Sequence, residues 1–354
     1  MKHFLLIWST VFAVLGWGQS KATTLPAISV IGDMVTTIHD EATTSTIRGV
    51  EMAFQHYLTP TVQADIFLGV HALDDGAYEW DIEEAFITAN DPISLLLSTR
   101  FSVPGLGLIF GKKQVPIGIL NTLHPEQWHF VDRPLVHQAL FGADHALSGT
   151  GIAVNYTFPF PFFSQLTLGT WTMTPPHDVH ADDNHADETL THSHADGPTS
   201  EPWGHQSVTT RLWNSLAISP NQELSLGLNY MHGESSLSES RRMMGIDARY
   251  TNTIGTRTLQ MDFETHVLDT DIAEETPSRG SMVQAHVDLT SDINLGVRYD
   301  YVNLANTAWN QTAYAITRRL TDTSRFRLQV THGDETVVYA QFLFGMGPHS
   351  HGLR

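Results

Sequence analysis

The residues best suited to chemistry lie in one stretch, Pro175 to His205. It holds six histidines and seven acids but no Lys or Arg. Imidazole and carboxylate groups offer lone pairs at neutral pH and suit Zn²⁺ and related cations. We therefore expect an exchangeable Zn²⁺ or another divalent cation here, and no organic cofactor. The expected donors are His177, His180, His185, His192, His194 and His205, supported by Asp182, Asp183 and Asp187.

The alternative for this stretch is a solvated acidic loop that binds no ion. It lacks the C-x-x-C and H-E-x-x-H spacings that define a fixed metal geometry. Its few apolar residues cannot form a core, so we predict a long loop that other elements must hold in place.

The first 22 residues have the features of a secretory signal peptide. Lys2 gives a basic start, an apolar run extends from Phe4 to Trp17, and small residues precede a cleavage site after Ala22. The apolar run of about 14 residues is shorter than the roughly 20 that a transmembrane helix needs. We therefore expect export with cleavage at residue 22.

After the signal, segments of about ten residues alternate apolar and polar side chains, with turn residues between them. In the segment 62–73, Ile66 and Leu68 fall on one face, while Asp65 and His71 fall on the other. One face suits lipid and the other a wet lumen. A soluble β-sandwich would show similar alternation, so the connections must discriminate between the two folds.

Short and long connections follow one another along the chain. Thr59–Thr61 and Ser219–Gln222 are short, whereas Gln114–Thr150 and Pro175–His205 are long. Short periplasmic turns and long extracellular loops are typical of transmembrane barrels. We predict an all-β fold, a transmembrane antiparallel β-barrel of about 16 strands within a range of about 14 to 18.

The predicted barrel spans residues 23–344, and residues 345–354 form a C-terminal tail. The region Ile87–Gly105 leaves the strand count open because its pattern fits neither a strand nor a turn.

The third predicted extracellular loop, Gln114–Thr150, is too long for a plain hairpin and rich in apolar residues that need burial. We predict that it folds into the barrel and narrows the lumen, where ionisable side chains commonly set selectivity. The alternative for each polar residue is structural: Asp132 and Arg133 would pair or cap to fix the loop, and backbone carbonyls would satisfy His124 and His129. The candidate constriction residues are His124, His129, Asp132, Arg133 and His137.

The charge and the missing motifs exclude two function classes. The net charge is −19, from 19 basic and 38 acidic residues, which makes nucleic acid a poor partner and cations good ones. There is neither a G-x-S-x-G nor an H-E-x-x-H motif, so we predict that the protein is not an enzyme.

Three segments resemble a known family: PAISVIGD at Pro26–Asp33, LNTLHPEQWHFVDRPLV at Leu120–Val136, and GPHSH at Gly347–His351. They are similar to Gram-negative outer-membrane proteins related to the phosphate-selective porin O/P superfamily, a group described as zinc-regulated outer-membrane receptors. The resemblance implies a porin-like barrel in the bacterial outer membrane that is connected with zinc supply.

Two functions follow from these patterns. The first is a porin-like channel for small solutes, with the 175–205 loop capturing a divalent cation at its mouth. The second is a non-conducting barrel that displays a metal-binding or adhesive loop. Outer-membrane lipid and a divalent metal ion are the expected partners, and a homotrimer is left open.

Overall fold

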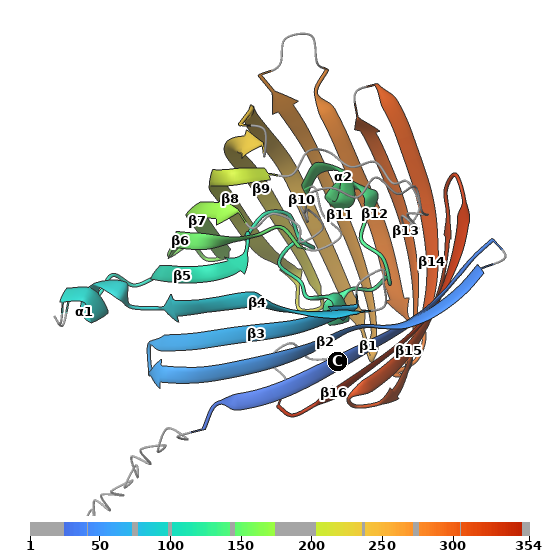
Figure 1. The fold of residues 1–354 in the computed structure, drawn as a ribbon. Coiled ribbons are helices and arrows are strands. Elements are labelled where there is room, and N and C mark those ends of the chain that lie inside the picture. The colour runs from blue at the N-terminus through green and yellow to red at the C-terminus, as the bar shows by residue number, and fades with distance from the viewer. Residues whose placement is uncertain are drawn as a thin grey trace, which may run out of the picture.

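The computed structural model describes residues 25–40, 42–72, 77–97, 101–141, 146–173, 203–235, 238–271, 276–304 and 306–348. Sixteen strands form a closed antiparallel barrel, in which each strand pairs with its sequence neighbours and β1 pairs with β16 (Figure 1). The prediction of an all-β barrel of about 16 strands is confirmed.

The strands are β1 Ala27–His39, β2 Ala42–Thr59, β3 Val62–Ala72, β4 Tyr78–Ala89, β5 Leu106–Gln114, β6 Ser148–Thr157, β7 Phe163–Met173, β8 Trp203–Ser219, β9 Gln222–Ser235, β10 Ser240–Ile254, β11 Arg257–Thr270, β12 Ser278–Asp288, β13 Ile293–Leu304, β14 Thr307–Thr321, β15 Ser324–His332 and β16 Thr336–Met346. The helices are α1 Pro92–Leu97, η1 Pro125–Gln127 and α2 Leu135–Phe141. None of the helices in the described ranges is long and apolar enough to cross a membrane.

Side-chain alternation places apolar groups outside and polar groups inside. On β13, Val297 and Tyr299 are exposed, whereas Arg298 and Asp300 are buried. An apolar outer face with a polar interior is what a membrane barrel requires, and closure leaves no unpaired strand edge. The two-residue period read from the sequence is thus the inside–outside period of the wall.

The region 87–105 resolves into three pieces. β4 continues to Ala89, α1 follows, and β5 begins at Leu106. Leu96 and Leu97 of α1 are each 70% exposed, and α1 lies outside the ring of strands (Figure 1). The β4–β5 connection lies at the rim where the other connections are short turns, but it is long. It is an exception to the predicted alternation of short and long connections.

The long β5–β6 connection turns into the barrel, as predicted, and α2 lies within the ring of strands (Figure 1). It comprises residues 115–147, hereafter the inward segment, because β5 extends to Gln114 and β6 begins at Ser148. These bounds are slightly narrower than the predicted Gln114–Thr150.

The apolar core lies between the inward segment and the wall. Val136, Leu140 and Phe141 of α2 belong to one buried cluster with apolar side chains of β7 to β13. These wall residues are Trp171, Met173, Trp203, Met231, Met243, Leu268, Met282 and Val302.

Other predicted boundaries change or lie outside the described residues. β8 begins at Trp203, so the predicted loop ends before His205, and β16 ends at Met346 rather than at residue 344. The signal peptide 1–22 and most of the tail 345–354 lie outside the described residues.

A charge on the outer face tests the assignment of that face to lipid. Leu228, in the middle of β9, is 52% exposed, and Leu228→Arg should destabilise the barrel in lipid vesicles by about 2–4 kcal/mol. Urea titration of the vesicle-inserted protein measures the change.

Glu234→Arg is the matched control, since Glu234 is exposed on the same face near the strand end. There we expect a cost of about 0–1 kcal/mol. Equal costs at both positions would contradict the membrane placement.

Candidate functional site

The inward segment leaves the wall beside β4. β5 pairs with β4 only from Leu108 to Lys112. Beyond Lys112, the N–H of Gln114 donates to Glu84 Oε1 at 2.7 Å, so a hydrogen bond to a side chain of β4 takes the place of a backbone bond between the two strands. Lys112 Nζ lies 3.2 Å from Asp81 Oδ2, and Lys113 Nζ lies 3.6 Å from Glu84 Oε1. These charged contacts hold the point at which the chain turns inward.

A β-bulge in β4 turns two consecutive glutamates toward the interior. Phe67 pairs with Glu84, and Leu68 pairs with Ile82, so Glu83 is the extra residue. In regular alternation one of the two carboxylates would face lipid. Both lie near His124 instead, with Glu84 Oε2 at 3.1 Å from Nε2 and Glu83 Oε2 at 3.8 Å from Nδ1.

His124 is the centre of the first polar cluster. Its Nδ1 lies 2.8 Å from Glu51 Oε2 on β2, and its ring packs in a tilted arrangement against that of Phe67, with 4.8 Å between the ring centroids. Burial by itself would lower the pKa of His124, but the hydrogen bonds with Glu51 and Glu84 hold it well above the ordinary value. Burial raises the pKa of Glu126 to about 8, and the Glu51 carboxylate acts in the same direction.

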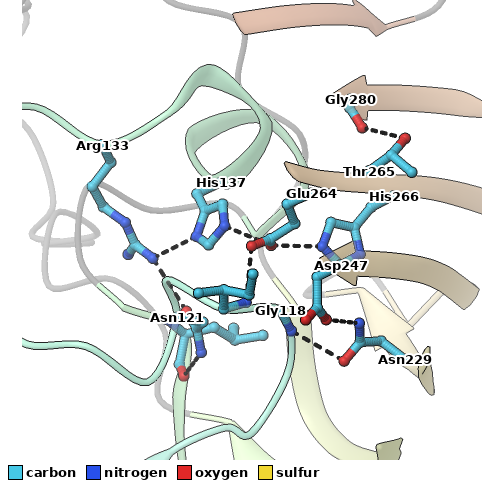
Figure 2. A network of polar contacts seen from close by, with 12 residues as sticks. Gly118, Asn121, Arg133, His137, Asn229, Asp247, Glu264, Thr265, His266 and Gly280 are labelled. Carbon is cyan, nitrogen blue, oxygen red and sulfur yellow. Dashed lines mark hydrogen bonds and ion pairs between the residues drawn. The ribbon is translucent and has the colours of Figure 1, made fainter. Parts of the chain in front are cut away.

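Glu264 on β11 is the centre of the second cluster (Figure 2). Its Oε1 lies 2.7 Å from His137 Nε2 and 2.7 Å from His266 Nε2, while the N–H of Ile119 donates to Oε2 at 2.9 Å. Gly118, with φ +65°, precedes Ile119, and a Cβ there would collide with the Glu264 carboxylate. A glycine is therefore required for this close approach.

His137 is neutral in this arrangement. Arg133 Nη2 donates to His137 Nδ1 at 2.9 Å, so Nδ1 is the unprotonated acceptor. The ring proton is therefore on Nε2, which donates a hydrogen bond to Glu264. Burial lowers the pKa of His137 to about 4, against the opposing effect of Glu264. Charging the ring would remove the acceptor and place a second cation beside Arg133.

A third set of contacts joins the inward segment to β15 and β2. Arg327 Nη2 donates to the carbonyl of Trp128 at 2.6 Å, and Gln329 Oε1 accepts from the N–H of Val131 at 2.6 Å. Arg48 Nη1 donates to the carbonyl of Val131 at 2.7 Å. Together with the first two clusters, these bonds tie the segment to strands on several sides of the lumen.

The structure places all five predicted constriction residues on the inward segment but divides them among the clusters. Asp132 does not pair with Arg133. It meets Arg298 of β13 at 2.9 Å, whereas Arg133 contacts Asn121 and His137. The ring of His129 stacks on that of His286 at 3.3 Å.

The wall partners of these residues were not among the predicted sites. Their sequence signal is a charged or amide side chain on the polar face of an alternating strand, which indicates the direction of the side chain but not its partner. They are Glu51, Glu84, Glu264, Arg298, Arg327 and Gln329.

The predicted metal donors of the 175–205 stretch fall mostly outside the described residues. His177, His180, His185, His192, His194, Asp182, Asp183 and Asp187 all do so. His205 lies within β8.

Comparison with solved structures identifies the architecture. The outer membrane protein OmpT of Vibrio cholerae with loop L8 deleted has a TM-score of 0.58 and 9% identity, covering 91% of this chain and 99% of that one. An anion-selective porin from Comamonas acidovorans has a TM-score of 0.57 and 11% identity, covering 91% and 100%. The trimer form of OmpT has a TM-score of 0.55 and 8% identity, covering 91% and 100%.

The chain has the porin fold. No protein-family model matches it. An uncharacterized protein of Aquifex aeolicus (strain VF5) is 30% identical over 105 residues, which are 30% of this chain and 19% of that protein. This chain thus matches under a fifth of that relative's length. The comparisons establish the fold, and the resemblance to the porin O/P superfamily stays a prediction.

Glu264→Gln tests the second cluster. The amide can present only one acceptor oxygen to the donors of His137, His266 and Ile119. We expect docking of the inward segment to weaken by about 1–3 kcal/mol, while the barrel stays intact. Hydrogen exchange of residues 115–141 measures the change.

Glu223→Gln is the control and should leave exchange unchanged, because Glu223 is exposed at the start of β9 and contacts Ser215 and Ser225 of the wall. Unaltered protection in Glu264→Gln would show that this cluster does not hold the segment.

The neutral state of His137 predicts acid sensitivity. With a folded pKa of about 4 and an ordinary value of about 6.5, the undocked segment binds protons that the docked one excludes. The stabilisation is complete above about pH 6.5 and is lost as pH falls through about 4. Exchange of residues 115–141, corrected for intrinsic rates, should therefore rise between pH 7 and 4.5.

His137→Gln is the control, because an amide can still donate to Glu264 and accept from Arg133 but does not titrate. Its exchange should depend less on pH than that of the wild type. An identical pH dependence would assign the effect to a group other than His137.

Proposed function

We propose that this protein is a porin-like, non-enzymatic channel for small solutes in the bacterial outer membrane. The observation that carries the proposal is the inward segment, which hydrogen bonds to side chains of β2, β4, β11, β13 and β15 inside a porin fold. A segment held in this way narrows the lumen without depending on its own secondary structure.

Selectivity is proposed to arise where the segment meets the wall. The predicted constriction residues His124, His129, Asp132, Arg133 and His137 all lie on this segment and approach charged or aromatic groups of the wall or of the segment. Ionisable side chains at a narrowing commonly select permeating ions. The net charge of −19 favours cations over anions.

We further propose that the 175–205 stretch captures Zn²⁺ or another divalent cation at the outer mouth. The support is its composition, six histidines and seven acids without a base. The stretch connects β7 to β8 at the same rim as the β5–β6 connection. Capture must be weak and exchangeable, because conduction needs release as well as binding.

One observation favours a second candidate, a barrel that does not conduct and only displays this loop. Apolar side chains of the inward segment pack densely against the wall. A cavity of about 10 Å³ beside Trp128, His129 and Arg298 has room for about one water. Such packing is also what a plug would show.

The proposed surroundings are outer-membrane lipid and further copies of the chain. Lipid is supported by the apolar outer face. A homotrimer is supported by the trimer form of the structurally similar OmpT.

Single-channel recording in a planar bilayer tests the proposal. The mature protein should give cation-selective current steps, and micromolar Zn²⁺ should modulate them. The control replaces His177, His180, His185, His192 and His194 by Gln, which should preserve the steps but abolish the response to Zn²⁺.

A silent bilayer from correctly folded protein would favour the plugged barrel. Current that Zn²⁺ does not affect, in wild type and variant alike, would leave a channel without metal capture.

A further inference from the structure

A second concentration of metal donors lies inside the barrel, distant in sequence from the 175–205 stretch. Glu51 of β2 and His124 and Glu126 of the inward segment are all buried, and one ligand atom from each lies within 4.8 Å of the others. Glu83 Oε2 lies 3.8 Å from His124 Nδ1. One imidazole and up to three carboxylates therefore converge on one point.

Glu126 supplies an independent indication that something is bound. Its side chain is 2% exposed, and its Oε1 has no hydrogen-bond partner among the described residues. A buried polar atom without a partner is costly, and such atoms call for a ligand, an ion or a water. Glu126 is one of the three residues whose ligand atoms converge.

The orientation of His124 suits a metal ligand. Its Nε2 is 3.1 Å from Glu84 Oε2, whereas its Nδ1 faces Glu51 Oε2 at 2.8 Å. Metal-binding histidines usually donate their second ring N–H to a carboxylate, which orients the ring. Glu84 is the orienting carboxylate here, and a cation would replace the proton between Nδ1 and Glu51.

Charge at this point also favours a cation. The carboxylates of Glu51, Glu83 and Glu84 and the carboxyl group of Glu126 surround His124. Lys113 approaches Glu84, and His71 lies 3.0 Å from Glu83. Arg325 is a further positive charge that acts on Glu126 electrostatically, but no hydrogen bond between the two is present among the described contacts.

We propose that Glu51, His124 and Glu126, with Glu83 beside them, form a binding site for a divalent first-row transition metal ion inside the barrel. One imidazole with several carboxylates suits Mn²⁺ or Zn²⁺. The ion would join the inward segment to β2, and through Glu84 to β4. This site does not depend on channel activity or on the 175–205 stretch.

The test uses Mn²⁺ as the probe. The full mature protein is stripped with a chelator and titrated with MnCl₂, and free Mn²⁺ is followed by electron paramagnetic resonance. Glu126→Gln should bind one fewer tight equivalent than wild type, or bind it at least about tenfold more weakly. Zn²⁺ should compete for the same equivalent.

Glu126→Gln is expected to fold because the unpartnered oxygen makes no bond that the amide would lose. If circular dichroism shows a folding defect, Glu51→Gln takes its place. Glu234→Gln, exposed on β9, is the control and should bind as wild type does. All variants keep the 175–205 stretch, so differences among them report on the interior site alone.

Equal binding by folded wild type and Glu126→Gln would overturn the proposal and leave the cluster as a hydrogen-bonded, metal-free network. Equal losses in Glu126→Gln and Glu234→Gln would overturn it as well, because the effect would then be general charge removal. Failure of Zn²⁺ modulation in the bilayer bears only on the outer loop.

Discussion

The backbone of a segment inside a barrel needs hydrogen-bond partners, and this requirement governs the interior of the molecule. Outside η1 and α2, the inward segment has little secondary structure to satisfy its own N–H and C=O groups. Wall side chains take that role, as Glu264 does for Ile119, Gln329 for Val131 and Arg327 for Trp128. Since an unmade buried hydrogen bond costs about 1–3 kcal/mol, polar wall residues and segment depend on one another.

The wall is correspondingly divided. Near the ends of β7 to β13 that lie at the rim of the β5–β6 connection, apolar wall side chains such as Trp171, Met231 and Met282 share one buried cluster with apolar side chains of the inward segment. Elsewhere it presents charged groups, many of them neutralised within the wall, as Arg211 is by Asp247. Buried ion pairs add little net stability but are costly to break. The interior therefore favours one arrangement of the segment over others.

The bulge in β4 connects this architecture with the proposed chemistry. It directs Glu83 as well as Glu84 to the interior, so acids outnumber bases around His124. A cation inside the barrel would find several acidic side chains close together there. The same residues hold the point where the chain leaves the wall, so ion binding and docking of the segment would be linked through His124.

Much of the fold could be predicted from local patterns, and much of the site could not. Alternation around Val297 and Arg298 indicated which face of the strand points to lipid and which to the interior. The length and apolar content of residues 114–150 predicted an inward loop. The consecutive Glu83 and Glu84 interrupt the alternation of β4, but only the strand pairing shows that this interruption is a bulge that turns both side chains inward. Asp132 next to Arg133 suggested a local pair, whereas Asp132 contacts Arg298 of β13, which is distant in sequence.

By itself the sequence determined the barrel, its approximate strand number and its polar interior, because strand period and connection length are local properties of the chain. Only the tertiary structure decided which wall residue meets which part of the inward segment. Val131 and Gln329, for example, are 198 positions apart. Barrel closure brings such pairs together. From the sequence alone, many charged residues on polar strand faces could have been the partner of a given residue of the inward segment, and only the register and the path of the segment distinguish among them.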